Sequence, residues 1–239
     1  MSEIHIDNVS KTFDDGVTYS VRNLTLSIKK GTIFGFLGPN GAGKTTTMKM
    51  LVGLAKPSEG EIKVLGALPD DMEMKSRIGF MPEAPTFYAH LSGEEFLVLV
   101  ASLFSLSDTD EKVKEVLEKV GLFEARKRKI KTYSKGMQQR LGLAQAIINN
   151  PDILFLDEPL DGLDPLGRAE IKKIMLALKA KKKTIFLNTH ILGDVEEICD
   201  MVGIIDKGSL IALDTPKNLS KGYKDLEAAF VAIVNNSRQ

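Results

Sequence analysis

The chain of 239 residues is long enough for one large domain or two small ones, and its 43% hydrophobic and 27% charged residues are ordinary for a globular protein. Lys plus Arg and Asp plus Glu each number 32, which gives a formal net charge of zero. This balance argues against a nucleic-acid-binding protein that works through bulk positive charge, because neutralising phosphates requires clustered Lys and Arg. Two short basic runs, 127–131 and 179–183, are interpreted as solvated surface, so no nucleic-acid partner is expected.

The first third of the chain contains strand-like segments around a glycine-rich break. Residues 3–9 and 21–28 are expected to be strands, and the second alternates apolar and polar side chains, as a strand with one wet face does. Residues 32–37 are almost all apolar, which suits a strand buried on both faces. Glycines then interrupt the pattern, and a helix is expected to begin near Gly43. Residues 78–81 are expected to form another short strand.

The pattern changes to helices between residues 83 and 150. Ser92 and Glu95 have the spacing of a capping box ahead of an apolar run. Asp108 is expected to begin a second helix, whose apolar residues recur at helical spacing. A third helix is expected at about 136–149. This segment is therefore predicted to be an all-helical insertion.

Strands resume after the helical insertion. Residues 153–156 and 184–187 are short apolar runs, separated by a helix whose start is marked by Asp164 as N-cap and by Pro165. Residues 201–213 are expected to form a hairpin, and 224–235 a terminal helix. Alternation of buried strands with helices predicts an α/β fold with a mostly parallel sheet.

Residues 38–45 read Gly-Pro-Asn-Gly-Ala-Gly-Lys-Thr and fit the pattern G-x-x-x-x-G-K-[ST]. Glycines let the backbone curl so that several N–H groups face one phosphate chain, and the following helix adds its positive end. Lys44 is expected to reach the β- and γ-phosphates of ATP, and the Thr45 hydroxyl to hold Mg²⁺. A flexible turn is the alternative, but this loop follows a buried strand and opens a helix, as a phosphate loop must. The predicted ATP-binding residues of the loop are Gly38, Pro39, Asn40, Gly41, Ala42, Gly43, Lys44, Thr45 and Thr46.

Polar side chains follow two of the later buried strands. Asp157 and Glu158 come directly after residues 153–156. Beside a phosphate loop, Asp157 could ligate Mg²⁺ directly or through water, and Glu158 could accept a proton from the attacking water as a general base. His190 follows the strand at 184–187, from which it would approach the γ-phosphate. An ordinary polar loop is the alternative for each position, and the nearby phosphate loop favours catalysis by Glu158, His190 and Lys44.

Over almost its full length the chain resembles the nucleotide-binding subunits of ABC transporters. Residues 133–137, Tyr-Ser-Lys-Gly-Met, resemble the signature of that family, usually Leu-Ser-Gly-Gly-Gln, and lie about twenty residues before Asp157 as in the family. Ser134 and Gly136 match the family pattern, whereas the other three residues differ. The resemblance implies that Ser134 and the start of the following helix bind the γ-phosphate held by an opposite subunit. A plain Ser-capped helix is the alternative.

Further positions carry over from the same resemblance. Asp164 matches an aspartate in the loop after the catalytic glutamate, and His190 matches the switch histidine. Phe13 lies 25 residues before Gly38, where the family places an aromatic side chain that stacks on adenine. Glu83 takes the place of the family's lid glutamine, and the difference in charge is a departure from the family. Its carboxylate could still contact Mg²⁺ or a water bound to it, so Glu83 is expected at the metal site with Thr45 and Asp157.

The resemblance also implies an architecture. It predicts the P-loop nucleotide hydrolase fold in its ABC ATPase form, with a mostly parallel sheet core, an antiparallel β subdomain and an all-helical insertion. One ABC ATPase domain is expected for residues 1–239. Its parts would be a nucleotide-binding core at 1–82 and 151–222, a helical subdomain at 83–150 and a C-terminal helix at 223–239.

The function implied is that of an ATP-hydrolysing motor of an ABC transporter, with ATP and Mg²⁺ as cofactors. Its partners would be a second ATPase subunit, identical or different, and a transmembrane permease subunit. The signature variant favours an exporter. Two alternatives remain: a soluble ABC-type mechanical ATPase acting on ribosomes or chromosomes, and a P-loop kinase for a small metabolite. The kinase would not explain Ser134, Gly136, Asp164 and His190 together.

The expected location is peripheral, on the cytoplasmic face of the cell membrane. Cys199 is the only cysteine, which fits a reducing compartment and excludes an intrachain disulfide. The longest apolar stretch, residues 96–104, is far shorter than the roughly 20 residues that cross a bilayer. A separate membrane subunit is therefore expected to dock, and Phe87, Tyr88 and Leu91 are candidates for its docking pocket.

Overall fold

The structure is a computed structural model that describes residues 2–13 and 16–238. Its described part contains two sheets. The three-stranded antiparallel sheet has the order β2-β1-β4, and the six-stranded sheet has the order β5-β6-β7-β3-β8-β9. Neighbours in the larger sheet are parallel except β9, which pairs antiparallel with β8. The strands are β1 (Ser2–Thr12), β2 (Tyr19–Lys29), β3 (Ile33–Leu37), β4 (Glu59–Val64), β5 (Ile78–Met81), β6 (Ile153–Asp157), β7 (Thr184–Asn188), β8 (Met201–Asp206) and β9 (Ser209–Asp214).

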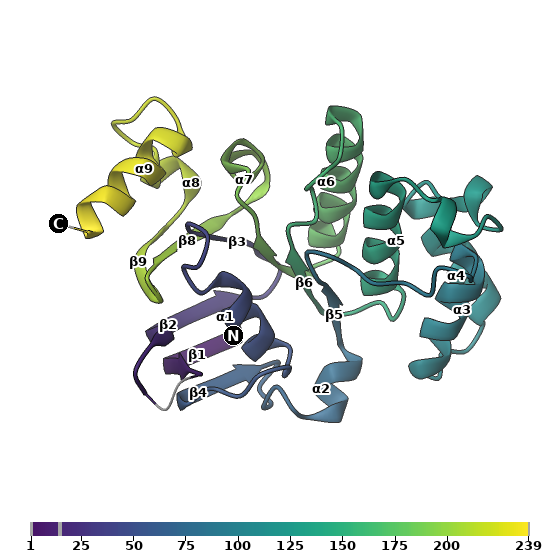
Figure 1. Cartoon of the computed structure of the whole chain (residues 1–239), viewed down its shortest axis with the longest axis horizontal. Coiled ribbons are helices and arrows are strands. Elements are labelled where there is room, and N and C mark those ends of the chain that lie inside the picture. The colour runs from purple at the N-terminus through teal and green to yellow at the C-terminus, as the bar shows by residue number, and fades with distance from the viewer. Residues whose placement is uncertain (1, 14–15, 239) are drawn as a thin grey trace.

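Most helices lie around these sheets, and three of them form a separate group at one end of the molecule (Figure 1). Helices α3, α4 and α5 make that group, which we call the helical segment, and α8 and α9 lie at the opposite end beside β9. The helices are α1 (Lys44–Leu51), α2 (Met72–Ser76), α3 (Gly93–Leu103), α4 (Thr109–Lys119), α5 (Lys135–Ile147), α6 (Pro165–Ala180), α7 (Leu192–Ile198), α8 (Pro216–Leu219) and α9 (Leu226–Ser237), with short 3₁₀ turns at Phe123–Ala125 and Ile130–Thr132.

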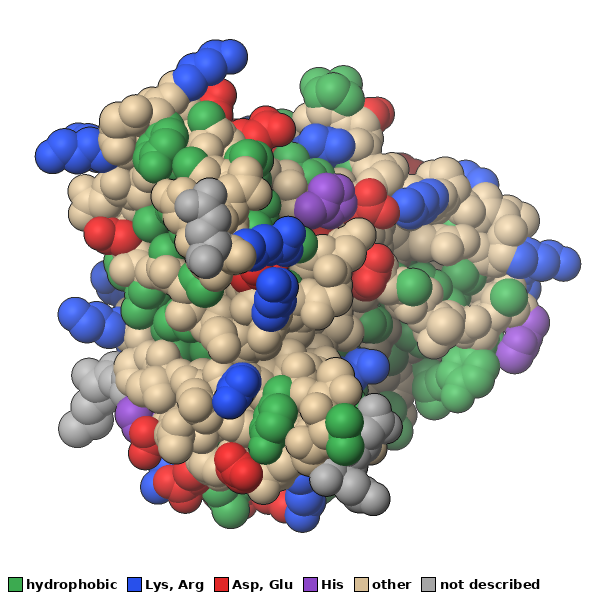
Figure 2. Space-filling view, turned by 60° about the vertical axis from the view of Figure 1, so that its left-hand side comes forward, with side chains coloured by type: hydrophobic (Ala, Val, Ile, Leu, Met, Phe, Trp, Pro, Cys, Tyr) green, Lys and Arg blue, Asp and Glu red, His purple; other side chains and the backbone are tan. Residues whose placement is uncertain are grey.

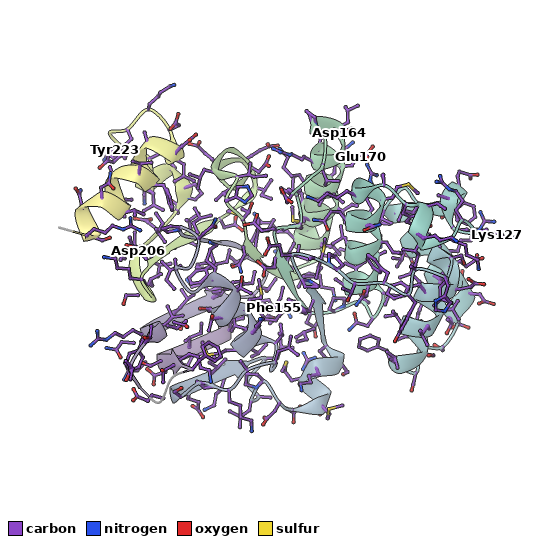
Figure 3. The ribbon with its side chains drawn as sticks, viewed as in Figure 1. Lys127, Phe155, Asp164, Glu170, Asp206 and Tyr223 are labelled. Carbon is purple, nitrogen blue, oxygen red and sulfur yellow. The ribbon has the colours of Figure 1, made fainter. Side chains whose placement is uncertain are left out.

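Three apolar clusters hold these parts together. One joins the helical segment and α6 to one face of the large sheet, and a second fills the space between the two sheets and α1. Phe155 of β6 belongs to the second cluster, at the centre of the molecule (Figure 3). A third, smaller cluster packs α7 and α9 against β8. Strands β3, β6 and β7 are buried at every position, which explains their continuous apolar sequences.

Local signals in the sequence account for several element ends. The capping box of α3 is confirmed, because Ser92 and Glu95 exchange both hydrogen bonds. Asp164 caps α6 with Pro165 at the first turn, as expected. Asp108 precedes α4 as predicted, but it has a φ of 54° and its side chain makes no capping bond. The sequence interpretation did not identify β4, α2, α7 or α8, which are short or mostly polar.

The charged surface agrees with the balanced composition. Figure 2 shows Lys and Arg side chains interspersed with Asp and Glu over the visible face. Lys127 is exposed at the outer side of the helical segment (Figure 3). In the second basic run, Lys179 pairs with Asp200 and Lys183 with Asp152. The expectation that both runs are surface positions therefore needs one refinement, since Lys183 is largely buried in its ion pair.

Candidate functional site

The phosphate loop runs from the end of β3 to the start of α1. Its glycines are required by close backbone approaches as well as by conformation. A Cβ on Gly43, whose φ is 108°, would lie 2.3 Å from the carbonyl oxygen of Ser20. A Cβ on Gly38 would lie 2.3 Å from the carbonyl oxygen of Ile205. The loop is therefore wedged between β2 and β8, which fixes its curled shape.

Lys44 begins α1 and extends back across this loop. Its ammonium donates to the carbonyl oxygens of Gly38, at 2.7 Å, and Pro39, at 3.1 Å. Burial lowers the pKa of Lys44, and the nearby carboxylates of Glu158 and Asp157 act in the opposite direction. The arrangement places a partly desolvated cation beside the curled backbone, where an anionic phosphate would be attracted.

Asp157 lies opposite Thr45, at the carboxyl end of β6. The Thr45 hydroxyl is 3.4 Å from one oxygen of Asp157, and the amide of Asn188 donates to the other at 3.1 Å. Burial raises the pKa of Asp157, and the carboxylates of Glu158 and Glu83 raise it further. The side-chain oxygen of Asn188 is buried and has no hydrogen-bond partner among the residues that the structure describes. A cation would relieve this crowding of buried oxygen atoms.

Glu158 follows Asp157 and faces His190. One oxygen of Glu158 lies 2.9 Å from Nδ1 of His190 and accepts from the His190 backbone N–H at 3.3 Å. The backbone of Glu158 has a φ of 51°, the left-handed region that costs a non-glycine residue about 1–3 kcal/mol. Its own N–H donates to the carbonyl of Asn188. Neighbouring contacts therefore hold Glu158 in a backbone conformation that a non-glycine residue rarely adopts.

These side chains line one pocket, which we call the phosphate-loop pocket, with a volume of about 700 Å³. Among the described residues, no group of three His, Cys, Asp or Glu could hold a metal ion by itself. One carboxylate, one hydroxyl and a phosphate chain suit Mg²⁺, which keeps several waters and rarely uses an all-protein cage. The residues present thus fit Mg²⁺ bound together with a nucleotide. The lining residues are Ser20, Asn40, Gly41, Gly43, Lys44, Thr45, Thr46, Glu83, Asp157, Glu158, Asp161 and His190.

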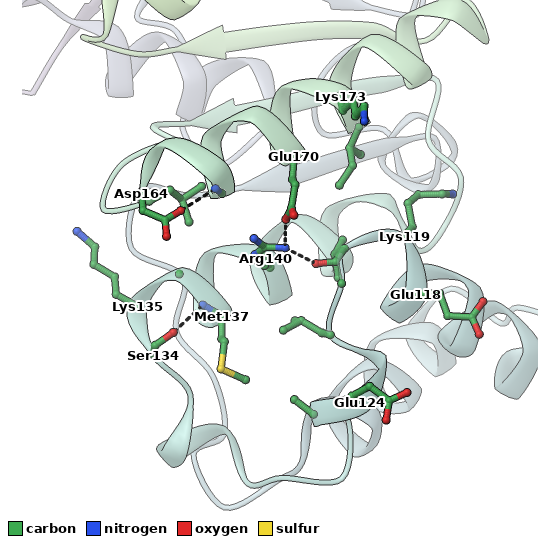
Figure 4. Close-up of a pocket in the computed structure, with 18 of the residues that line it drawn as sticks. Glu118, Lys119, Glu124, Ser134, Lys135, Met137, Arg140, Asp164, Glu170 and Lys173 are labelled. Carbon is green, nitrogen blue, oxygen red and sulfur yellow. Dashed lines mark hydrogen bonds and ion pairs between the residues drawn. The ribbon is translucent and has the colours of Figure 1, made fainter.

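The signature residues lie in a different hollow, the signature groove, between α6 and the helical segment (Figure 4). Ser134 caps α5 by accepting from the backbone N–H of Met137, and Asp164 caps α6 by accepting from that of Gly167. Gly136 lines the same groove, whose volume is about 1110 Å³. Ser134, Gly136 and Asp164 do not line the phosphate-loop pocket of the same copy.

Of two further residues predicted to contact the nucleotide or its metal, one lines the phosphate-loop pocket and the other does not. Glu83 lines it beside the metal candidates, although it carries a charge where the family has an amide. Phe13 is 64% exposed and is not among the residues that line the pocket, and the ammonium of Lys11 lies 5.0 Å from its ring. The proposed stacking of Phe13 on adenine stays a prediction.

Sequence reasoning missed three residues that support this site. Asn188 orients Asp157, and Asp161 lines the pocket while pairing with Lys135 at 2.7 Å, a bond that lowers the pKa of Asp161. Gln139 of α5 donates to backbone carbonyls of the loop that carries Glu158. The polar ends of strands could have suggested Asn188. A polar residue on the buried face of a helix was the available signal for Gln139.

Comparison with known proteins agrees with this geometry. The chain is 48% identical over 196 residues to an uncharacterised ABC transporter ATP-binding protein of Nostoc, which covers 80% of this chain and 58% of that protein. It is 41% identical to a bacitracin transport ATP-binding protein of Bacillus licheniformis, covering 89% and 71% of the two chains. A solved dimeric ATP-binding cassette in a post-hydrolysis state, bound to ADP and Pi, aligns with a TM-score of 0.82 and 25% identity, covering 89% of this chain and 98% of that one.

The chain thus spans less than two thirds of the Nostoc relative's length. The expected fold is confirmed, with a mostly parallel sheet, an antiparallel sheet and a helical segment arranged as in an ATP-binding cassette. The sequence model of ABC transporters matches residues 21–161, which include the phosphate loop, the signature and the paired carboxylates. This chain therefore belongs to the ABC transporter family, among its ATP-binding proteins.

Proposed function

We propose that this chain is an ATP-hydrolysing motor subunit of an ABC exporter, which couples closure of an ATPase dimer to a separate membrane subunit. The observation that carries the proposal is the phosphate-loop pocket, where three segments of the chain converge. The start of α1 supplies Lys44 and Thr45, the end of β6 supplies Asp157 and Glu158, and the loop after β7 supplies His190. Nucleotide hydrolysis requires a cation at the phosphates, ligands for a metal ion and a positioned base. Lys44 would supply the first, Thr45 and Asp157 the second, and Glu158 beside His190 the third.

Each side chain has a distinct task in this proposal. Lys44 binds the terminal phosphates and stabilises the negative charge that develops on them. Glu158 accepts a proton from the attacking water, and the imidazole of His190, 2.9 Å away, keeps its carboxylate oriented. Thr45 and Asp157 would hold Mg²⁺, which supplies Lewis-acid neutralisation of the phosphate oxygens.

A second copy or a related subunit would complete the site. In this proposal, Ser134, Gly136 and Asp164 of one subunit face the nucleotide held by the other. Two observations support it: these residues line an open groove away from their own phosphate loop, and the structural neighbour bound to ADP and Pi is described as dimeric. Ser134 also lies at the N-terminal end of α5, whose partial positive charge favours an anionic group such as a phosphate.

The membrane partner is inferred from an apolar surface and from the relatives. In the part of the chain that the structure describes, no helix is long and apolar enough to cross a bilayer. Tyr88 and Leu103 are 58% and 77% exposed, and Leu99 lies one turn before Leu103 on α3. Figure 2 shows hydrophobic side chains gathered over the helical segment. Such a surface suits a short helix of a permease at the cytoplasmic face of the membrane.

The structure changes one part of the docking expectation. Phe87 packs edge-on against Phe96, with ring centroids 5.2 Å apart, and Leu91 packs on the same apolar cluster. These two residues therefore anchor the segment that leads into α3. Tyr88 remains the exposed member of the predicted docking pocket.

The test of the ATPase proposal compares the wild-type chain with Lys44→Ala. The wild type should bind a fluorescent ATP analogue and release phosphate, whereas the variant should bind weakly and release none above background. Lys49→Ala is a matched control, because it lies one turn further along α1 and does not line the pocket. Wild-type affinity and turnover in Lys44→Ala would overturn the proposal.

The partner proposal needs a separate measurement in membranes of the native host. Changing Tyr88 and Leu103 together to Ser should preserve ATP binding but prevent co-purification with a membrane protein. Val231→Ser, a similarly exposed apolar position on α9, serves as the control. Co-purification of the wild type with ribosomes or chromosomes, and with no membrane protein, would point to the soluble mechanical ATPase instead.

A further inference from the structure

Gln139 lies on α5, the helix that follows the signature residues. Its side chain contacts the turn from Glu158 to Asp161 of the same copy. It is 3% exposed, and glutamine is seldom buried without a specific hydrogen-bonding role. Its amide nitrogen donates to the carbonyl oxygen of Glu158 at 3.2 Å and to that of Asp161 at 3.3 Å. One side-chain amide therefore bonds both ends of the turn that begins with the proposed general base.

The turn needs this support because its first residue is strained. Glu158 has a φ of 51°, and Pro159 follows it, so the chain at this point has left the extended conformation usual before proline. The N–H of Asp161 bonds the same Glu158 carbonyl at 3.1 Å, which closes the turn. Gln139 adds a second donor to that carbonyl and thereby fixes the peptide plane from which the Glu158 side chain projects.

We propose that Gln139 is a positioning residue for ATP hydrolysis: it holds the backbone of Glu158 so that the carboxylate points at the attacking water. This inference rests on the proposed function of the phosphate-loop pocket. It also gives the signature helix a direct connection to the general base within one subunit. Ser134 caps α5 and Gln139 lies on its second turn, so one helix carries both residues.

The experiment measures steady-state ATP hydrolysis by the full chain carrying Gln139→Met, which keeps the length of the side chain but donates no hydrogen bond. The value of kcat should fall about 10–100-fold, since small misplacements of a catalytic group have effects of this size, and KM for ATP should stay within about twofold. Gln138→Met is the matched control, because the Gln138 amide bonds the carbonyl of Tyr133 and, within the described residues, makes no bond to the turn from Glu158 to Asp161.

Repeating the substitution in a chain that carries Glu158→Gln distinguishes positioning of Glu158 from a general effect on folding. If Gln139 acts through Glu158, then Gln139→Met should cause no further loss of kcat in a chain that already carries Glu158→Gln. An equal loss in both backgrounds, an unchanged kcat, or a rise in KM that matches the fall in kcat would each overturn the inference. Should Gln139→Met fail to fold, Gln139→Asn keeps a buried amide with shorter reach, and the same comparison applies.

The wild-type measurement separates this inference from the one on which it rests. Wild-type chain without ATP hydrolysis would refute the proposed function. Active wild type with a fully active Gln139→Met variant would leave the proposed function intact and refute the role of Gln139.

Discussion

The phosphate-loop pocket and the signature groove lie in one chain but differ in how their functional side chains are held. In the pocket, Lys44, Asp157, Glu158 and His190 contact one another or their immediate neighbours, and most are partly or fully buried. In the groove, the side chains of Ser134 and Asp164 each accept a hydrogen bond from the backbone of the helix that they cap. The pocket is thus assembled within one copy, whereas Ser134, Gly136 and Asp164 line a separate hollow, as half of a site shared between two copies would do.

The largest effect is expected from Glu158→Gln, which removes the proposed general base and keeps the size of the side chain. Loss of a general base lowers rates by about 10²–10⁴-fold, so kcat should fall by that factor while ATP affinity is preserved. Chains with bound Mg-ATP should then accumulate as closed dimers, visible by size-exclusion chromatography. A monomer with near-normal turnover would refute the role of Glu158.

Ser134→Arg tests whether the signature groove contacts the nucleotide that the other subunit binds. The substitution places a long cation where the groove is open, so hydrolysis should be lost while the isolated subunit binds ATP normally. Thr132→Arg is the control, since that exposed residue lies nearby but does not line the groove. Mixing Ser134→Arg chains with Lys44→Ala chains sharpens the comparison, because a mixed dimer would contain one intact pair of loop and groove.

Activity recovered in that mixture, which neither variant has alone, would confirm that the two hollows work across subunits. Failure of the mixture to recover activity, despite formation of mixed dimers, would mean that each copy is self-sufficient and that the comparison drawn above is wrong.

Asp157 provides a pH test confined to the pocket. Because burial and two carboxylates raise its pKa above the ordinary value of about 3.8, Mg-ATP affinity should begin to fall, on acidification, at a higher pH than for an exposed aspartate. The folded chain holds this proton more tightly than the unfolded chain does. The contribution of Asp157 to the free energy of unfolding without nucleotide should therefore rise as the pH falls through the raised pKa.

Asp157→Asn should remove both pH effects, weaken Mg-ATP binding and leave the stability without nucleotide equal or higher. Isothermal titration and thermal unfolding between pH 4 and pH 8 measure the two quantities, where this range spans the ordinary carboxyl and histidine pKa values of roughly 4 and 6.5. Identical pH profiles for the variant and the wild type would show that Asp157 does not titrate in the expected direction.

The smallest effect is expected at Lys172 on α6, the helix that lines one side of the signature groove. Its ammonium bonds the buried carboxylate of Asp194 at 2.9 Å and also contacts Glu197, both on α7, the helix that follows His190. Lys172→Met should lower the free energy of unfolding by about 1–3 kcal/mol, because Asp194 loses its main partner. Urea unfolding measures this, with exposed Lys173→Met as the control. Equal stabilities would mean that the ion pair does not fix α7.

Particular residues show how far the sequence could be interpreted. The phosphate loop was recognisable because its glycines and Lys44 are contiguous, and the strand at Ile153–Asp157 because burial on both faces leaves a continuous apolar run. The short helix at Leu192–Ile198 was missed, because its seven residues contain too few turns for a periodic pattern. The sequence places Phe87 in the docking pocket, whereas its contact with Phe96 arises from how the preceding segment folds back onto α3.

The sequence by itself determined the fold class, the contiguous phosphate loop, the acidic end of β6 and the caps of α3 and α6. These features depend on residues that are close along the chain, where backbone geometry and burial leave few alternatives. Tertiary structure alone decided that Asn188 orients Asp157, that Gln139 supports Glu158 from another part of the chain, and that Ser134 lines a hollow separate from its own phosphate-loop pocket. Those relations arise from the order of strands in the sheet and the placement of the helical segment against it, which bring together residues far apart in sequence.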